Sequence, residues 1–296
     1  MRSLTTDSVI HVMSSDNPPA MAVKSGETFS VETAKPGIPD EVFSRDYTKQ
    51  PFPKRVLTIT GPIFVEDAEP GDVLKVKIES IELDTMGKMW MGQWMGVLMD
   101  EVDHCYMRKV AIDRGEVRFS DSLSFPIRPM IGTIGVAPAG DGVDCVLPGS
   151  YGGNMDSLSA APGNTIYLPV YVPGALLAVG DVHAAMGYGE VLGTGIETGS
   201  TVVMTVELIK NRELKHPVAE AEEFFEIIVS DTDFMQACKE LTRAAIDFVS
   251  ERRGCGFDEG YAIVGQTCDL KVLQIVNYCV TVSMRIPKLI LEKKKI

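Results

Sequence analysis

The residues best suited to chemistry gather in a glycine-rich stretch of the chain, from Gly152 to Glu197. Six side chains in it carry an acid, an amide or an imidazole: Asn154, Asp156, Asp181, His183, Glu190 and Glu197. Imidazole and carboxylate groups bind divalent metal ions and transfer protons. The glycines between them let backbone segments approach one another closely. The composition of this stretch therefore predicts a pocket with metal-ligating and acid–base groups.

Asp181 and His183 form the most suggestive pair in this stretch. If residues 180–184 are extended, both side chains project from the same face, because side chains alternate along a strand. One imidazole with carboxylates suits zinc better than calcium, which prefers many oxygen ligands. Asp156 is the predicted third ligand, since the two glycines before Asn154 allow close approach. We therefore expect a divalent ion, zinc rather than calcium.

Glu190 stands among glycines and is the predicted proton carrier for a metal-bound water, with Glu197 as the alternative base. Asn154 is predicted to orient a substrate or an oxyanion. A single acid in a glycine-rich loop is more often a turn cap, and a single histidine on a strand is more often structural. The clustering of these residues is what favours a functional reading.

Two other groups offer rival chemistry. The segment from Asp100 to His104 is rich in potential ligands, but an acidic run of this kind is usually a solvated face. Cys145 could act as a nucleophile without a metal, yet it lies in an apolar strand-like run with no base nearby, where thiols are usually inert. Both are predicted to be structural.

Composition and charge exclude several functions. The chain has 296 residues, 45% of them hydrophobic, and a formal net charge of −13, which disfavours binding to nucleic acid. No apolar run reaches the roughly 20 residues of a membrane span, and residues 1–13 lack the features of a secretory signal. Six scattered cysteines without a CxxC pair indicate reduced thiols. We expect a cytoplasmic protein that does not bind membranes.

Short strands separated by turns dominate the first two thirds of the chain. Residues 73–83 alternate apolar and polar side chains, and similar patterns occur at 19–31, 163–169 and 201–209, which indicates a sandwich or a barrel. Beyond residue 216 we predict a helix with N-caps at 230–232 and a C-cap at Gly254, a second helix from near Asp258 towards Cys268, and one strand over 273–284. The predicted regions are 1–215 and 216–296, packed together. Pairing of exposed sheet edges makes a homodimer the expected assembly.

Several motifs in this order resemble the acetamidase/formamidase family over nearly the whole chain. The most specific are Gly152-Gly-Asn-Met-Asp156, Gly180-Asp-Val-His-Ala184 and Gly193-Thr-Gly-Ile-Glu197, and Arg128-Pro-Met-Ile-Gly-Thr-Ile-Gly-Val-Ala-Pro138 accompanies them. The resemblance implies a mainly β fold, a jelly-roll-like β-sandwich with an α+β C-terminal portion. It also implies metal-assisted hydrolysis of short aliphatic amides, such as formamide and acetamide, to carboxylate and ammonia.

Two positions depart from the pattern that the resemblance implies. Family members commonly carry Gly-Asp-Gly-Glu where this chain has Gly187-Tyr-Gly-Glu190, and many carry a histidine where Tyr151 stands. If a relative uses either group as a ligand or base, the chemistry differs here. The alternative function is therefore a catalytically silent β-sandwich that binds a metal or a small ligand.

Overall fold

Two large β-sheets form most of the protein. The computed structural model describes residues 1–35, 57–92, 95–104 and 106–291. Within them, sheet A has nine strands. In spatial order these are β1 (Arg2–Leu4), β5 (Thr28–Thr33), β19 (Ser200–Ile209), β7 (Val73–Leu83), β16 (Thr165–Pro169), β20 (Val218–Glu220), β21 (Phe224–Asp231), β23 (Val280–Pro287) and β22 (Asp269–Gln274).

Sheet B has twelve strands within the same described ranges. Its main path is β11 (Leu123–Pro126), β10 (Glu116–Ser120), β9 (Tyr106–Asp113), β8 (Met86–Met91), β18 (Glu197–Thr198), β17 (Leu177–His183), β12 (Met130–Gly135), β15 (Gly152–Asn154) and β14 (Pro148–Gly149). β6 (Ile59–Val65) pairs with β17 and also with β2 (Val9–Ile10) and β4 (Met21–Val23). β3 (Val12–Met13) and β13 (Val143–Asp144) form a separate short pair.

The main core lies between the two sheets. In β7 the side chains of Leu74, Val76 and Ile78 are fully buried, whereas the intervening lysines are partly exposed. The same cluster contains Ile131 from β12 and Val179 from β17, which belong to sheet B. Period-two strands that bury one face against each other in this way form a sandwich. The prediction of a mainly β-sandwich fold is confirmed, and β7 has the bounds that the sequence predicted.

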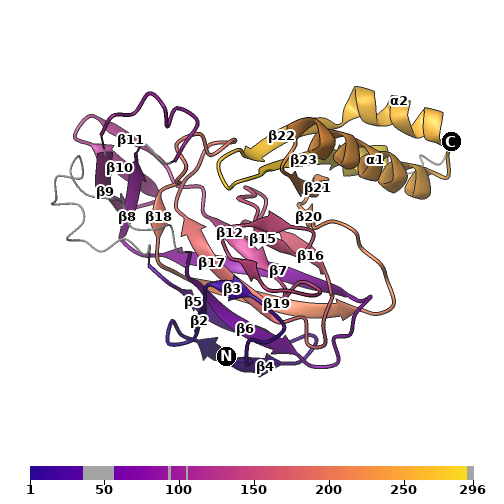
Figure 1. Cartoon of the computed structure of the whole chain (residues 1–296), viewed down its shortest axis with the longest axis horizontal. Coiled ribbons are helices and arrows are strands. Elements are labelled where there is room, and N and C mark those ends of the chain that lie inside the picture. Colours follow the sequence, from indigo (N-terminus) through magenta and orange to yellow (C-terminus); the bar gives the residue numbers. More distant parts are fainter. Residues whose placement is uncertain (36–56, 93–94, 105, 292–296) are drawn as a thin grey trace.

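The C-terminal part of the chain extends sheet A and carries the helices. β20 pairs with β16, so the sheet continues without a break from the sandwich into β21, β23 and β22. Helices α1 (Phe234–Arg253) and α2 (Phe257–Thr267) cover one face of this extension, and Figure 1 shows them on one side of β21–β23. A second apolar cluster, including Leu241, Val282 and Ile286, fills the space between helices and strands. The predicted boundary between the regions 1–215 and 216–296 stays a prediction.

Both predicted helices are present. Asp233 is the N-cap of α1, one residue beyond the predicted capping segment, and its side chain accepts a hydrogen bond from the Gln236 backbone N–H. Gly254 ends the helix in the left-handed conformation that a C-cap glycine favours. The short helix η3 (Lys288–Ile290) follows β23. No helix in the described ranges is long and apolar enough to cross a membrane.

The prediction of a single strand over residues 273–284 is wrong. β22 ends at Gln274 and β23 begins at Val280, and the two strands pair antiparallel around the intervening loop. The loop turns at Tyr278, whose φ of 61° lies in the left-handed region. The Gln274 side chain accepts hydrogen bonds from the backbone N–H groups of Val276 and Asn277 and thereby stabilises the turn. This loop lies at the functional site.

Candidate active site

His183 is the centre of a cluster of buried acids. It is the last residue of β17, and the pairing of β17 with β18 places Glu197 directly beside it. His183 Nε2 lies 3.2 Å from Glu197 Oε1 and 3.6 Å from Asp181 Oδ1. The ligating atoms of these three residues all lie within 4.8 Å of one another. The strand pairing of sheet B therefore assembles a group that could hold one metal ion.

Asp156 and Glu190 also face His183. One ligating atom from each of Asp156, His183 and Glu190 lies within 4.8 Å of the other two. Gly132 of β12 makes room for the acids, because a Cβ atom there would lie 2.8 Å from both Asp156 Oδ1 and Asp181 Oδ2. His183 thus belongs to two overlapping groups of potential ligands, and the assignment of Asp156 as the third ligand stays a prediction.

Three of the acids adopt backbone conformations that are unusual for residues with a side chain. The φ angles are 51° at Asp156, 56° at Asp181 and 45° at Glu190. Such left-handed conformations cost of order 1 kcal/mol each and concentrate at functional sites. Asp181 consequently departs from the extended geometry that the sequence predicted, although it still lies near His183. The strain is consistent with side chains held for chemistry.

Burial and neighbouring charges determine the protonation of the cluster. Burial opposes a charge on His183, but the carboxylates of Glu197 and Asp181 hold its pKa well above the ordinary value. The pKa of Glu197 is raised to about 7, chiefly by burial; the charge of His183 opposes the rise and that of Asp181 adds to it. Neither ring nitrogen of His183 has a hydrogen-bond partner among the described residues. A fully buried imidazole whose Nε2 lies 3.2 and 3.6 Å from two carboxylates offers the donor set of a divalent metal site.

A second layer of polar groups supports the acids. Thr133 donates a hydrogen bond to Asn154 Oδ1 at 2.8 Å and lies 3.4 Å from Asp181 Oδ2. The Asn154 amide also donates to the Val146 carbonyl at 3.4 Å, so it is engaged within the protein. Asn277 donates to Asp156 Oδ2 at 2.6 Å from the loop between β22 and β23. The catalytic role of Asn154 stays a prediction, and Asn277 is a site residue that the sequence reading missed.

Replacing Asn277 by alanine is expected to lower amide-hydrolysis kcat/KM by roughly 10–100-fold, the effect typical of a lost outer-shell hydrogen bond. Asp156 would lose the donor that fixes its carboxylate. Asn277→Gln keeps an amide and is expected to recover part of the loss. Asn17→Ala is the control, because Asn17 makes an exposed hydrogen bond to Val12 and should not affect kinetics. Unchanged kcat/KM in Asn277→Ala would show that Asp156 needs no such support.

Tyr188 and Tyr151, the two departures from the family pattern, are both held within the protein. The Tyr188 hydroxyl is hydrogen-bonded to Arg285, which also forms an ion pair with the fully buried Glu226 at 2.8 Å. Burial, together with the charge of Glu226, raises the pKa of Tyr188 while Arg285 opposes the rise. The Tyr151 hydroxyl donates to the Leu147 carbonyl at 2.7 Å. Both tyrosine hydroxyls therefore have partners outside the acid cluster.

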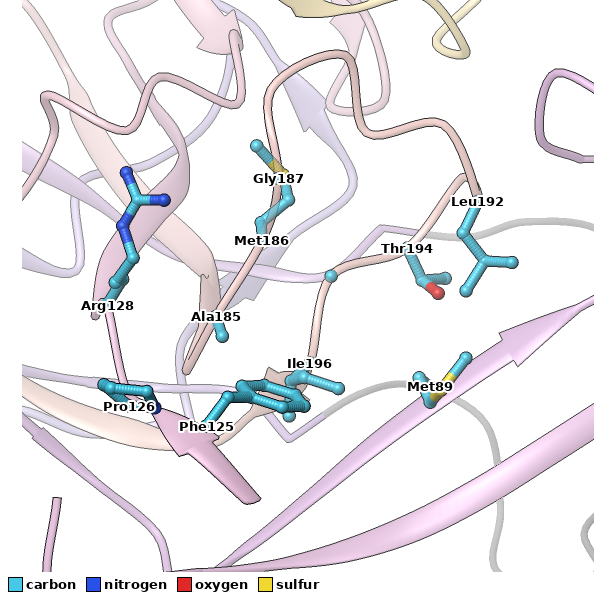
Figure 2. Close-up of a pocket in the computed structure, with 11 residues that line it drawn as sticks. Met89, Phe125, Pro126, Arg128, Ala185, Met186, Gly187, Leu192, Thr194 and Ile196 are labelled. Atoms are coloured by element: carbon cyan, nitrogen blue, oxygen red, sulfur yellow. The ribbon is translucent and has the colours of Figure 1, made fainter. Parts of the chain in front are cut away.

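An apolar pocket of about 440 Å³ borders the cluster. Figure 2 shows Met89, Phe125, Leu192 and Ile196 around it, with Arg128 at one side. Gly195 also lines the pocket and is in contact with His183, since a Cβ there would lie 2.6 Å from His183 Nδ1. Gly195 thus lies between the pocket and the imidazole ring of His183.

The rival chemistries find little support. Cys145 is fully buried, and burial raises the pKa of its thiol to about 12, which leaves it protonated and unreactive at neutral pH. His104 is exposed and lies 2.7 Å from the neighbouring Asp103. The described residues around His104 form no group of three potential metal ligands. Cys105 and Trp94 lie outside the described residues.

Solved structures of related proteins share this fold over its whole length. A predicted acetamidase/formamidase from Thermoanaerobacter tengcongensis is 38% identical, with a TM-score of 0.89 over 98% of this chain and 96% of the other. An acetamidase from Bacillus halodurans is 33% identical, with a TM-score of 0.93 over 99% and 100% of the two chains. A γ-lactamase from Delftia acidovorans shares the fold alone, at 21% identity and a TM-score of 0.65.

The Acetamidase/Formamidase family profile matches residues 7–146 and 139–293, and the chain belongs to this family. The resemblance seen in the sequence is thereby confirmed. The acetamidase of Mycolicibacterium smegmatis is 44% identical over 75 residues, which are 25% of this chain and 18% of that protein. The formamidase of Methylophilus methylotrophus is 36% identical over 81 residues, 27% of this chain and 20% of that protein. These matches span a fifth or less of the curated relatives.

Proposed function

We propose that the protein hydrolyses the C–N bond of primary carboxamides, giving a carboxylate and ammonia. One observation carries the proposal: the fully buried His183 lies among four carboxylates and against Gly195, which lines an apolar pocket. The names of the related acetamidases and formamidases support amides as the substrate class. Amides react slowly with water, so a site of this kind must both polarise the carbonyl and activate the nucleophile.

We propose that a divalent metal ion is held by Asp181, His183 and Glu197. Their ligating atoms lie within 4.8 Å of one another, and one imidazole with two carboxylates is a donor set that zinc binds readily. A bound ion of this kind lowers the pKa of its water and polarises a carbonyl oxygen. We favour zinc over calcium because calcium selects sites made of oxygen ligands alone.

The remaining acids serve proton transfer and positioning. Glu190 lies in the second group with His183 and Asp156, and we assign it the transfer of a proton from the attacking water to the leaving ammonia. Asn277 fixes Asp156, so that its carboxylate faces His183 in one orientation. Asn154 holds Thr133 against Asp181 and thereby restricts the orientation of that carboxylate. The burial of His183, Asp156, Glu190 and Glu197 excludes bulk water from the reacting atoms.

Ammonia release from formamide and acetamide tests the proposal. We expect turnover by the purified protein, loss of turnover after dialysis against a chelator, and recovery on addition of zinc but not of calcium. Turnover unaffected by chelation would overturn the metal assignment. Absence of turnover with every primary amide and every added ion would instead favour the catalytically silent binding protein.

Two further properties belong to the proposal. The five described cysteines form no disulfide, which supports a reducing compartment such as the cytoplasm. A homodimer stays a prediction that rests on the general tendency of open sheet edges to pair. We expect a small neutral amide as the ligand and no nucleic acid, in keeping with a net charge of −13.

A further inference from the structure

The pocket beside His183 is far larger than formamide or acetamide. Its volume of about 440 Å³ would hold about fifteen water molecules at about 30 Å³ each. Acetamide has only four non-hydrogen atoms and would fill a small part of this space. The volume lies instead within the range of roughly 300–1,000 Å³ that is typical of pockets for larger organic ligands.

Apolar side chains dominate the wall of the pocket. Met89, Phe125, Leu192 and Ile196 line it, together with Ala185 and Met186. Thr194 also lines it, but its hydroxyl donates to the Trp90 carbonyl at 3.0 Å. Among the described lining residues only Arg128 is charged, and it is exposed. A pocket of this composition favours hydrocarbon groups over polar ones.

The pocket and the acid cluster share one loop. Residues 185–187, Leu192 and residues 194–196 contribute to the pocket wall, and the same loop carries Glu190 and leads into Glu197. The Gly195 backbone N–H donates to Glu197 Oε1 at 3.1 Å, and Gly195 also contacts the His183 ring. Gly195 is therefore the residue that the pocket wall shares with the surroundings of His183 and Glu197.

From these observations we infer that the preferred substrate is a primary amide with an apolar acyl group of several carbons, which occupies this pocket. The inference rests on the proposed amide hydrolysis and specifies its substrate. The pocket receives the hydrocarbon chain, and the amide group at its end reaches His183 and the surrounding carboxylates. Chain length then determines the specificity constant.

The test compares acetamide, butanamide and hexanamide as substrates. We expect kcat/KM to rise by about fourfold for each methylene that becomes buried, up to hexanamide. Leu192→Trp fills the pocket and should reduce the ratio of kcat/KM for hexanamide to that for acetamide towards one. Val191→Trp is the matched control, because Val191 is 61% exposed and outside the pocket, and its ratio should equal that of the wild type. A misfolded fraction of a variant lowers kcat/KM for hexanamide and acetamide by the same factor, so the ratio of the two values does not change.

Two kinetic results would overturn the inference: acetamide as the best substrate, or an unchanged ratio in Leu192→Trp. If no amide is hydrolysed at all, the proposed function fails separately. The pocket is then tested by calorimetric dissociation constants for hexanamide and acetamide in the same variants. Tighter binding of hexanamide that Leu192→Trp removes supports the inference, and equal affinities overturn it.

Discussion

Replacing His183 by alanine is expected to lower the kcat for amide hydrolysis by about 10³-fold or more, since the proposed metal binding and water activation both depend on it. If the proposed metal ion is bound, the same change should release it, because the site then keeps only the carboxylate oxygens of Asp181 and Glu197. It should also lower the free energy of unfolding, since the buried carboxylates lose the imidazole that lies between them. Ammonia release, elemental analysis and urea denaturation measure the three effects.

His104→Ala is the control for the His183 experiment. His104 is exposed and contacts only the neighbouring Asp103 among the ion pairs that the structure describes. Metal content, kcat and stability should all remain at wild-type values. If His183→Ala itself retained both metal and turnover, the assignment of His183 as the central ligand would be wrong.

Gly132→Ala is expected to have the second-largest effect, although it adds a single methyl group. The new Cβ would lie 2.6 Å from the Asp181 carbonyl oxygen and 2.8 Å from Asp156 Oδ1. Either the backbone of β17 or the two carboxylates must move, and overpacking of this kind costs about 1–3 kcal/mol of stability. Because shifts of about 1 Å in a site reduce rates by about 100-fold, we expect a loss of that size in kcat/KM.

Gly265→Ala provides the matched comparison for Gly132→Ala. Gly265 lies within α2, and a Cβ there would meet no atom within 4 Å. Activity should be unchanged, and stability should rise by up to about 1 kcal/mol because alanine favours a helix over glycine. A Gly132→Ala variant with wild-type activity would show that Asp156 and Asp181 tolerate displacement.

Regular patterns were the features that sequence alone could predict. The alternation over residues 73–83 was enough to predict β7 with its observed bounds, and the apolar periodicity up to Gly254 predicted α1. Both patterns arise because one face of a strand or helix is buried and the other is exposed, so each can be recognised within a short stretch of sequence. Pairings between distant strands, such as β5 with β19, leave no comparable signal in a single sequence.

The site could be predicted in its residue types but not in its geometry. Clustering in sequence was sufficient to select His183 and its acids, which the structure brings together. Their left-handed backbone angles could not be anticipated, because residues other than glycine adopt them uncommonly and nothing in the local sequence indicates where. Asn277 was missed because residues 273–284 are mostly apolar or β-branched, which favours a continuous strand and obscures the turn. The wrong strand and the missed residue therefore have the same cause.

The contact between Asn277 and Asp156 joins residues 121 positions apart in the chain. In sheet A, β5 likewise pairs with β19, so residues 28–33 contact residues 200–205, far along the chain. Contacts of such high sequence separation form late and slowly during folding. Asn277 lies in the loop between β22 and β23, so its hydrogen bond to Asp156 can form only after sheet A has extended from β16 to β23. The hydrogen bond that supports Asp156 is therefore expected to be among the last features of the site to form during refolding.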